Sequence, residues 1–300
     1  MIKSTNRKPR PMSLERKTKW FGWVFMAPWL LGLIYFFIIP FASSFIYSIN
    51  FVTIGETGLD YEFLGLKNYA YMLQEDASFV RDVVGEVKNV LTQVPIILIY
   101  SIFVALLLNQ KFPGRLFARS LFFIPVIIAS GLVIQIIQKD LFANTNMRAD
   151  ESSIFQIGLI SEILGNLNFA SDLINIITTA VAQIFDLSWK SGVQILLFLS
   201  ALQRIPPTYY EVASVEGANA WDAFWKITFP VLSPSCLLVG VYTIVDSFTS
   251  QTNPVMKNII TRFNEVKYGY ASASAIIYFI VIGAFLGAVM LLARKRVHYT

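Results

Sequence analysis

Cysteine and histidine are nearly absent from this sequence of 300 residues, which contains one of each, Cys236 and His298. A disulfide needs two cysteines, and metal sites built by proteins need several cysteine, histidine or carboxylate ligands. The composition therefore excludes a disulfide framework and predicts no metal site. Cys236 lies within an apolar stretch, where we expect it to be a packed thiol.

Several short catalytic signatures are also missing. The sequence contains no G-x-x-x-x-G-K-[ST] loop for phosphate binding, no H-E-x-x-H for zinc and no G-x-S-x-G for a nucleophile. We therefore predict that the chain is not an enzyme and carries no catalytic residue or cofactor of its own. If ATP drives its function, another chain must bind the ATP.

Charged side chains make up only 14% of the sequence, whereas hydrophobic residues make up 55% and aromatic residues 15%. The hydrophobic and aromatic fractions exceed what the core of a soluble protein requires, and the charged fraction is low, which together indicate a membrane protein. A helix needs about 20 mostly apolar residues to span a bilayer. Six stretches meet this length: residues 20–45, 90–110, 117–138, 173–202, 232–252 and 270–293. We predict an all-α integral membrane protein with a basic tail at residues 1–19 and a single membrane domain at residues 20–300.

The positions of lysine and arginine predict the orientation, because cytoplasmic loops near helix ends carry an excess of them. Alternation of the six spans from a cytoplasmic N-terminus places four basic segments on the cytoplasmic side: residues 1–19, 111–119, 204–226 and 294–296. Three segments then face outward: residues 51–87, 139–172 and 253–268. The last of these carries Lys257, Arg262 and Lys267, which weakens the rule there. The net charge of +5 is explained by the basic cytoplasmic edge and requires no nucleic-acid partner.

A basic segment followed by an apolar run is also found in cleavable signal peptides. The run from Trp20 to Ile39 is longer than the usual apolar region of a signal peptide, and no convincing small-residue cleavage site follows it. We therefore interpret the run as a membrane anchor.

A half-polar stretch, YYEVASVEGANAWDAFWKITFP at residues 209–230, separates two of the predicted spans. Pro206 and Pro207 suit the end of one helix and the first turn of the next, and Gly217 suits a left-handed helix cap. Asn219 can cap a second short helix, which begins with a favourable acid at Asp222. The sequence therefore predicts a helical hairpin.

The second helix of this hairpin is expected to present large rings at Trp221, Phe224 and Trp225, among small residues. Such rings can insert into a groove of a partner protein, or they can rest at the level of the lipid headgroups, as interfacial aromatics do. The physical pattern alone leaves both alternatives open.

The hairpin resembles the cytoplasmic EAA loop of binding-protein-dependent ABC transporter permeases. It matches the pattern E-x-A-x-x-x-G, nine residues, then I-x-[LF]-P. In that family the loop is the coupling helix, which seats in a cleft of the ATP-binding subunit. The resemblance implies a coupling loop at residues 204–231 with these coupling residues: Glu211, Ala213, Gly217, Ala218, Trp221, Phe224, Ile227 and Pro230. Val212, Glu216 and Phe229 stand where alanine, aspartate and leucine are usual, and these changes are too small to affect docking.

Three further stretches resemble the sugar-importing branch of the family, on the side of the maltose and glycerol-phosphate type first permease. They are FLGLKNYAYML at residues 63–73, VALLLNQKFPGRLFARSLFFIPVII at residues 104–128 and LFLSALQRIPPTYYEVA at residues 197–213. The resemblance implies the type I importer permease fold, with six transmembrane helices and both termini in the cytoplasm. It is weakest at residues 140–172, which we expect to lie on the outer membrane surface or against a partner.

The family also implies partners. These are a second, related permease subunit, with a heterodimer expected, two ATP-binding subunits, and an extracellular or periplasmic solute-binding protein, all in or at the lipid of a bacterial cytoplasmic membrane. ATP and magnesium are expected on the ATP-binding partner only. In this arrangement the coupling helices transmit nucleotide-driven closure to the membrane helices, which produces alternating access.

Polar residues on the fourth predicted span are candidates for the solute pathway, because ionisable groups inside a membrane are costly and usually face a cavity or a partner. Asp186 and Lys190 can pair along one helix face beside Trp189. The three residues then line the outer mouth of the pathway, or they are a structural ion pair with an interfacial ring.

A polar stripe on the fifth predicted span is a second candidate. Its members recur near the three-to-four spacing of one helix face: Tyr242, Asp246, Ser247 and Gln251. Such a stripe lines the pathway or packs against the second permease. Gln135 and Gln194 are further candidates for the same cavity.

The predicted function is that of a permease subunit of an ATP-driven importer for carbohydrate. Within the family the alternative is another solute, such as a polyol, a glycerol phosphodiester or a peptide. A self-sufficient secondary carrier would need an ion site, for which only Asp246 and the Asp186/Lys190 pair are available. A membrane scaffold would use the hairpin for docking and would need no polar stripe.

Overall fold

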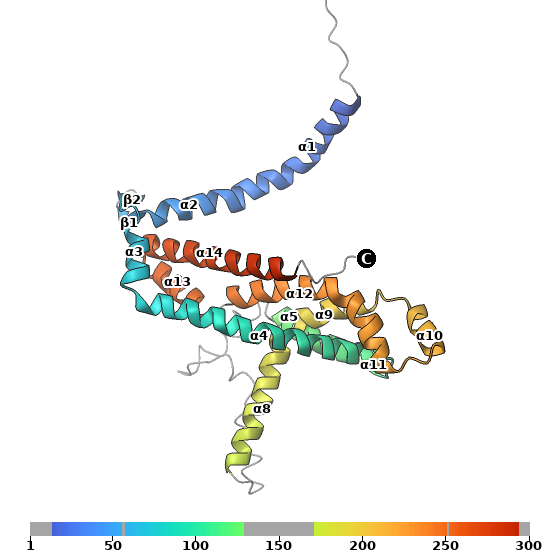
Figure 1. The fold of residues 1–300 in the computed structure, drawn as a ribbon. Coiled ribbons are helices and arrows are strands. Elements are labelled where there is room, and N and C mark those ends of the chain that lie inside the picture. The colour runs from blue at the N-terminus through green and yellow to red at the C-terminus, as the bar shows by residue number, and fades with distance from the viewer. Residues whose placement is uncertain (1–13, 56–57, 129–170, 251, 294–300) are drawn as a thin grey trace, which may run out of the picture. The chain divides into compact units, whose positions relative to one another are not determined.

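The computed structural model of the chain describes residues 14–55, 58–128, 171–250 and 252–293, which are mostly helical (Figure 1). They fall into two compact units. The first unit lies within Met1–Val83 and Pro254–Ile280, and the second within Val84–Asn253 and Val281–Thr300. Two long helices, α4 (Ala77–Asn109) and α14 (Tyr268–Ala293), each continue from one unit into the other.

The first unit begins with a long helical segment that contains a widened turn just before a proline. It consists of α1 (Leu14–Leu33), the π-helical turn η1 (Ile34–Ile38) and α2 (Ile39–Ser48). The Ile39 N–H donates to the carbonyl of Ile34, five residues earlier. Pro40 follows directly; it has no N–H, and its ring would crowd the carbonyl four residues before it in a regular helix. The wider turn accommodates the proline without ending the helix.

A two-stranded antiparallel hairpin follows, formed by β1 (Asn50–Gly55) and β2 (Gly58–Phe63). Its register pairs Asn50 with Phe63 and Gly55 with Gly58. The prediction of an all-α chain misses this hairpin. The β-branched run Val52, Thr53 and Ile54, which Gly55 ends, favours a strand, and the segment lies outside the apolar stretches that identify membrane helices.

Two further helices of the first unit, α3 (Lys67–Gln74) and the start of α14, meet the corner where α2 leads into β1. The Asn68 amide donates to the Ser48 carbonyl at 2.9 Å, and the Tyr69 hydroxyl donates to Ser48 Oγ at 2.7 Å. Gly269 lies so close to this corner that a Cβ there would be 3.2 Å from the Tyr47 carbonyl oxygen. The glycine therefore permits α14 to approach the end of α2.

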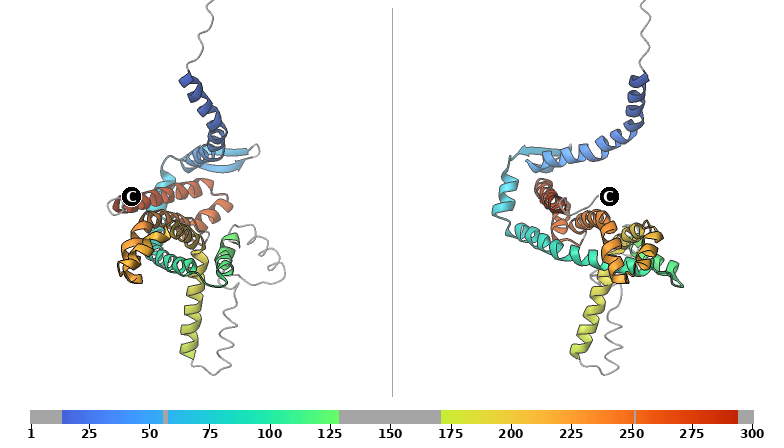
Figure 2. Two further views of the ribbon diagram at one scale, coloured as in Figure 1. Left: turned by 90° about the vertical axis from the view of Figure 1, so that its right-hand side faces the viewer. Right: turned by 45° about the vertical axis from the view of Figure 1, so that its right-hand side comes forward.

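The second unit packs its core where α4, α9 (Gly192–Leu202) and α12 (Phe229–Thr249) meet, and α5 (Arg115–Ile128) lies against it. The buried core residues come mainly from these three helices: Val104, Ala105, Leu108, Ile195, Phe198, Leu199, Ala201, Leu202, Ile205, Leu232 and Val239. A further helix, α8 (Ser171–Lys190), leads away from this core in every view (Figure 2).

Four helical segments among the described residues are long and apolar enough to cross a membrane: Trp20–Ser48, Ala77–Asn109, Ala220–Thr249 and Tyr268–Ala293. They coincide with the first, second, fifth and sixth predicted spans. The third predicted span is described only as far as Ile128. The fourth is not one uninterrupted helix, because α8 ends at Lys190 and α9 begins at Gly192. A serine–glycine pair at 191–192 has low helix propensity and explains the break.

Candidate functional site

The predicted helical hairpin is present in the second unit. Its first helix, α10, covers Pro207–Val215, with Pro206 in an extended conformation as the N-cap and Pro207 in the first turn. Proline suits this turn because its missing N–H would have no helical partner there and its φ is already helical. The two prolines therefore separate α9 from α10 as predicted, and α10 and α11 lie at one end of the second unit, beyond α9 and α12 (Figure 1).

The end of α10 is a Schellman motif with Gly217 in the left-handed conformation at φ +81°. The Gly217 N–H donates to the Ser214 carbonyl at 3.2 Å, and the Ala218 N–H donates to the Ala213 carbonyl at 2.9 Å. These two bonds satisfy carbonyls that the end of a helix would otherwise leave unpaired. The predicted left-handed cap at Gly217 is confirmed.

The second helix of the hairpin begins at a capped turn. Asn219 accepts a hydrogen bond from the Asp222 N–H at 2.9 Å and caps α11 (Ala220–Ala223), as predicted. Asp222 also pairs with Lys226 at 3.1 Å, one turn later. The π-helical turn η3 (Phe224–Thr228) then joins α11 to α12, and the Phe229 N–H donates to the Phe224 carbonyl directly before Pro230. The chain thus uses the same proline-adjacent widened turn here as in its first helical segment.

Four rings cover one side of this second helix. Trp221 contacts Trp225 with ring centroids 5.6 Å apart, Phe224 contacts Trp225 at 5.1 Å, and Trp225 contacts Phe229 at 5.2 Å. The Trp221 side chain is nevertheless 69% exposed. An exposed tryptophan supported by a ring cluster is held in place before any partner arrives, which favours it as a contact residue.

Both ends of the hairpin are anchored in the core of the second unit. Ile205 belongs to that core at the start of the hairpin, and Leu232 belongs to it after the end, with Ile227 packed against it. The Tyr210 hydroxyl and Thr228 Oγ1 lie 2.9 Å apart and link the two helices of the hairpin. The hairpin is therefore an exposed element with fixed ends.

The residues predicted for coupling take different positions on this element. Glu211 is exposed and its backbone carbonyl accepts from Ser214 Oγ at 2.7 Å, whereas Ala213 is buried under the hairpin. Gly217 and Ala218 form the turn, and Pro230 begins α12. Val215 was not among the predicted contacts, although its side chain is 88% exposed beside the turn.

The candidate pathway residues on α8 and α9 gather around the break between the two helices. Lys190 and Asp186 form the predicted ion pair at 2.8 Å, and Trp189 packs on Phe185 with centroids 5.9 Å apart. Gln194 is buried, and its amide nitrogen, in the orientation that satisfies it, donates to the Lys190 carbonyl at 3.1 Å. The glutamine thereby pairs a carbonyl at the break.

The polar stripe predicted on the fifth span lies on α12. Tyr242 and Asp246 are exposed, Ser247 is half-buried, and Gln251 lies outside the described residues, as does Gln135. Between the two exposed residues, Thr243 is fully buried and donates to the Val239 carbonyl at 2.7 Å. The stripe therefore occupies the face of α12 that points away from the core of the second unit.

Comparison with known proteins identifies the family. The chain is 31% identical over 284 residues to the multiple sugar-binding transport system permease protein MsmF of Streptococcus mutans, covering 88% of this chain and 92% of that protein. The chain belongs to the permease subunits of ABC transporters. This permease is therefore a multi-pass protein of the bacterial cytoplasmic membrane and the non-catalytic membrane component of its transporter.

Two further comparisons support this identification. The permease is 28% identical over 228 residues to the arabinooligosaccharides transport system permease protein AraP of Bacillus subtilis, covering 75% of this chain and 68% of that protein. Its fold matches a chain in the crystal structure of a bacterial ABC transporter involved in the import of alginate, with a TM-score of 0.64 at 16% identity, covering 95% and 98% of the two chains. No protein-family model matches the permease.

The sequence patterns placed two residues in no candidate site, although the structure makes them conspicuous. Glu86 is only 6% exposed on the membrane-length helix α4, although it falls in a segment predicted to face outward. Arg119 bonds to the end of α4 at Leu108, with Nη2 3.0 Å from the carbonyl oxygen. A charge on an apolar helix is the signal that could have singled out either residue.

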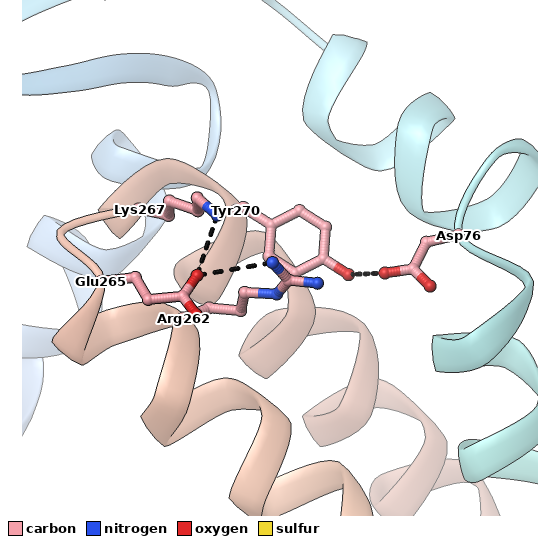
Figure 3. A network of polar contacts seen from close by, with 5 residues as sticks. All are labelled: Asp76, Arg262, Glu265, Lys267 and Tyr270. Atoms are coloured by element: carbon pink, nitrogen blue, oxygen red, sulfur yellow. Dashed lines mark hydrogen bonds and ion pairs between the residues drawn. The ribbon is translucent and has the colours of Figure 1, made fainter.

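A polar network links the start of α4 to α13 (Pro254–Asn264), the turn that follows it and α14 in the first unit (Figure 3). The Tyr270 hydroxyl donates to Asp76 at 2.5 Å, and the Arg262 guanidinium lies 5.4 Å from the centre of the Tyr270 ring. Glu265 accepts from Lys267 at 2.8 Å and pairs with Arg262 at 3.4 Å. These contacts link the start of α4 to the turn between α13 and α14.

Asp76 is also the N-cap of α4, because its carboxylate accepts from the Ser78 N–H at 3.1 Å and the Phe79 N–H at 3.2 Å, and from the Ser78 hydroxyl. Partial burial by itself raises the pKa of Asp76. The hydrogen bonds from Ser78, Tyr270 and the two backbone amides outweigh it and hold the pKa below its ordinary value.

We expect this carboxylate to stabilise the first unit in a pH-dependent way. A lowered pKa contributes stability that is complete above the unfolded value, about 3.9, and is lost as the pH falls through the folded pKa. Thermal unfolding of purified wild type and Asp76→Asn should therefore differ at pH 7, and the difference should shrink as the pH falls below about 4 and disappear only below the folded pKa of Asp76. Asparagine keeps the cap, so the substitution isolates the charge.

Tyr270→Phe is the control for this prediction, because it removes one donor to Asp76 and leaves the cap. In that variant the folded pKa of Asp76 should rise toward its ordinary value, so the contribution to stability at pH 7 should be smaller and its loss should be complete at a higher pH than in wild type. Equal melting temperatures of wild type and Asp76→Asn at pH 7 would contradict the stabilising role.

Proposed function

We propose that this permease is the transmembrane subunit of an ATP-driven, solute-binding-protein-dependent importer of carbohydrate, and that its hairpin at residues 204–231 couples the membrane helices to ATP-binding subunits. The observation that carries the proposal is the exposed helical hairpin with both ends in the core, formed by the residues that match the EAA pattern. Carbohydrate is favoured because MsmF and AraP are sugar-transport permeases by name.

The proposed topology has six transmembrane helices, both termini in the cytoplasm and the type I importer permease fold, with residues 1–19 as a basic cytoplasmic tail. The distribution of lysine and arginine supports it, because the tail, the turn with Lys111 and Arg115, and the hairpin with Arg204 and Lys226 all carry positive charge. Four membrane-length helices among the described residues occupy the positions of predicted spans.

The hairpin suits mechanical coupling because it is exposed where a partner can grip it and anchored where it joins the helices. Trp221 offers the largest exposed ring, and Glu211 offers an exposed carboxylate on the other helix of the hairpin. Movement of an ATP-binding subunit bound to these groups is transmitted through Ile205 and Leu232 to the core formed by α4, α9 and α12. ATP and magnesium belong to the partner subunits in this proposal.

The solute pathway is proposed to run past polar groups of the second unit. The Asp186–Lys190 pair with Trp189 and Gln194 marks the break between α8 and α9, and it offers a ring and hydrogen-bonding groups of the kind that bind sugar hydroxyls. The exposed stripe of α12 with Tyr242, Asp246 and Ser247 offers a second polar surface. A related permease subunit, with which this chain would form a heterodimer, would complete the cavity.

Affinity purification of the tagged chain from native membranes tests the proposal. We expect two ATP-binding subunits, a second permease and a solute-binding protein to copurify in stable ratio, and mass spectrometry of the binding protein to find a sugar bound to it. Recovery of the chain alone would contradict the importer assignment. A binding protein that retains a peptide or another non-sugar solute would contradict only the carbohydrate part.

A further inference from the structure

We propose that Arg119, on α5, is a positioning residue that bonds both the end of α4 and the start of the coupling hairpin. Through these bonds the hairpin, α4 and α5 move together. The inference rests on the proposed coupling function of the hairpin. It concerns how force enters the membrane helices, and the residue that carries it lies outside the EAA pattern.

Arg119 sits on the second turn of α5 and reaches across to α4. Its Nη2 donates to the Leu108 carbonyl at 3.0 Å, and Leu108 lies in the last turn of α4, which ends at Asn109. Carbonyls in the last turn of a helix have no partner within the helix, and a cation there also interacts favourably with the helix dipole. The guanidinium therefore caps α4.

The same guanidinium also meets the end of α9. Gln203 is the C-cap of α9 and stands directly before the coupling hairpin at residues 204–231. With its amide oxygen turned toward the arginine, Gln203 accepts from Nη1 at 3.3 Å and from Nη2 at 3.2 Å. One side chain on α5 thus bonds the end of α4 and the root of the hairpin.

The surroundings of Arg119 indicate that its hydrogen bonds to the protein, and not contact with water, keep its guanidinium between α4 and α9. Its Nε atom is buried and has no hydrogen-bond partner in the described part of the chain, and no carboxylate pairs with the guanidinium there. The nearby ends of α4 and α9 are themselves buried, at Leu108 and Leu202. A partly buried guanidinium that bonds only to neutral acceptors costs desolvation energy. Its planar fork can, however, bond two acceptors on different helices at once, which offsets part of this cost.

Such a bridge has a mechanical consequence. Without the Arg119 bonds, the segment between Gln203 and Pro206 would be held mainly by the apolar packing of Ile205, which is less directional than a hydrogen bond, and part of the hairpin's motion would be lost before it reached the helices. The bond from Arg119 fixes the root of the hairpin to α4 and α5. Lysine could not replace it, because a single ammonium lacks the fork that serves two acceptors on different helices.

Distance measurement between spin labels tests the proposal directly. Labels at Thr208 on α10 and Leu116 on α5, both exposed, report the separation of the hairpin from α5 in a background with Cys236→Ser. The complete transporter would be compared without nucleotide and after trapping with ATP and vanadate. In wild type we expect one narrow distance population that is the same in both states. Arg119→Met and Gln203→Met should each add a second population after trapping.

Three further variants separate this role from a general effect on folding. Gln203→Glu keeps an acceptor and should retain the single population, whereas Arg119→Lys should behave like Arg119→Met. The double variant Arg119→Met/Gln203→Met should match either single variant, because the two changes break the same bond. Arg115→Met is the matched control, since Arg115 lies one turn earlier on α5 and makes no side-chain bond within the described residues.

The possible results are distinguishable. A single narrow population in both Met variants would overturn the role of Arg119, and so would full rescue by lysine. If Arg119→Met fails to assemble, Gln203→Met tests the same bond from the other side. A wild-type chain that binds no ATP-binding subunit would instead refute the proposed function, while the label distances in the chain alone would still decide whether Arg119 pins the hairpin.

Discussion

Gly217→Pro protein should reach the membrane in wild-type amount and lose its ATP-binding subunits. Gly217 has φ +81°, whereas proline fixes φ near about −65°, so the turn between α10 and α11 cannot form. Proline also removes the N–H that donates to the Ser214 carbonyl at 3.2 Å. Because the hairpin is an exposed element, its disruption should abolish docking without preventing membrane insertion.

Alanine at the same position should produce a smaller version of this effect. A Cβ on Gly217 would meet no atom within 4 Å, so the cost is the left-handed backbone itself, about 1–2 kcal/mol. We expect the recovery of ATP-binding subunits to fall by about tenfold, since about 1.4 kcal/mol corresponds to tenfold in an equilibrium constant. Quantitative mass spectrometry of affinity-purified complexes measures this ratio.

Gly114→Ala is the matched control for Gly217→Ala. Gly114 has φ +85°, and a Cβ there would also meet nothing within 4 Å, so the two substitutions carry the same backbone cost. Gly114 lies in the turn between α4 and α5, away from the EAA pattern. Equal recovery of ATP-binding subunits from the two variants would contradict the coupling role of the hairpin.

Trp221→Ala should weaken the binding of the ATP-binding subunit to the permease by about 2 kcal/mol, which raises Kd about 30-fold. Trp221 is 69% exposed and held by contact with Trp225, so its ring is available to fill a pocket without first being ordered. A tryptophan of this kind is a common hot spot of protein interfaces. Titration of the detergent-solubilised permease with purified ATP-binding subunit gives the Kd.

The alternative role of Trp221 is to rest among lipid headgroups, and Trp23→Ala provides the comparison. Trp23 is 66% exposed on α1, nearly the same fraction, and lies within a membrane-length helix. We expect Trp23→Ala to leave the Kd unchanged. If both substitutions weaken the binding of the ATP-binding subunit, or if neither does, Trp221 is not a docking residue and the lipid role is favoured.

Local rules were enough to predict much of the hairpin from the sequence. Pro207 in a first turn, a left-handed Gly217 and an Asn219 cap each depend on backbone preferences that act within a few residues. The membrane-length helices were predictable for a similar reason, because length and apolar content alone decide whether a segment can cross a bilayer.

The search for long apolar runs missed two features, a pair of β-strands and a break inside an apolar stretch. The strands at Asn50–Phe63 lie in a polar segment that a search for apolar runs passes over. The break at Ser191 lies inside a stretch that is apolar on both sides, so hydropathy alone joined α8 to α9. In both places local residue types, a β-branched run and a serine–glycine pair, carried the signal that the average hydropathy of the segment concealed.

The amino-acid sequence by itself determined that this is a membrane protein with a capped helical hairpin that resembles the EAA loop of permeases, because composition, helix length, turn chemistry and a short motif are properties of neighbouring residues. Only the tertiary structure decided which distant residues meet. Arg119 contacts Leu108 and Gln203, and Asp76 contacts Tyr270, although each pair is well separated in the chain. No spacing rule predicts such pairs, because helix packing, and not sequence distance, brings them within hydrogen-bonding reach.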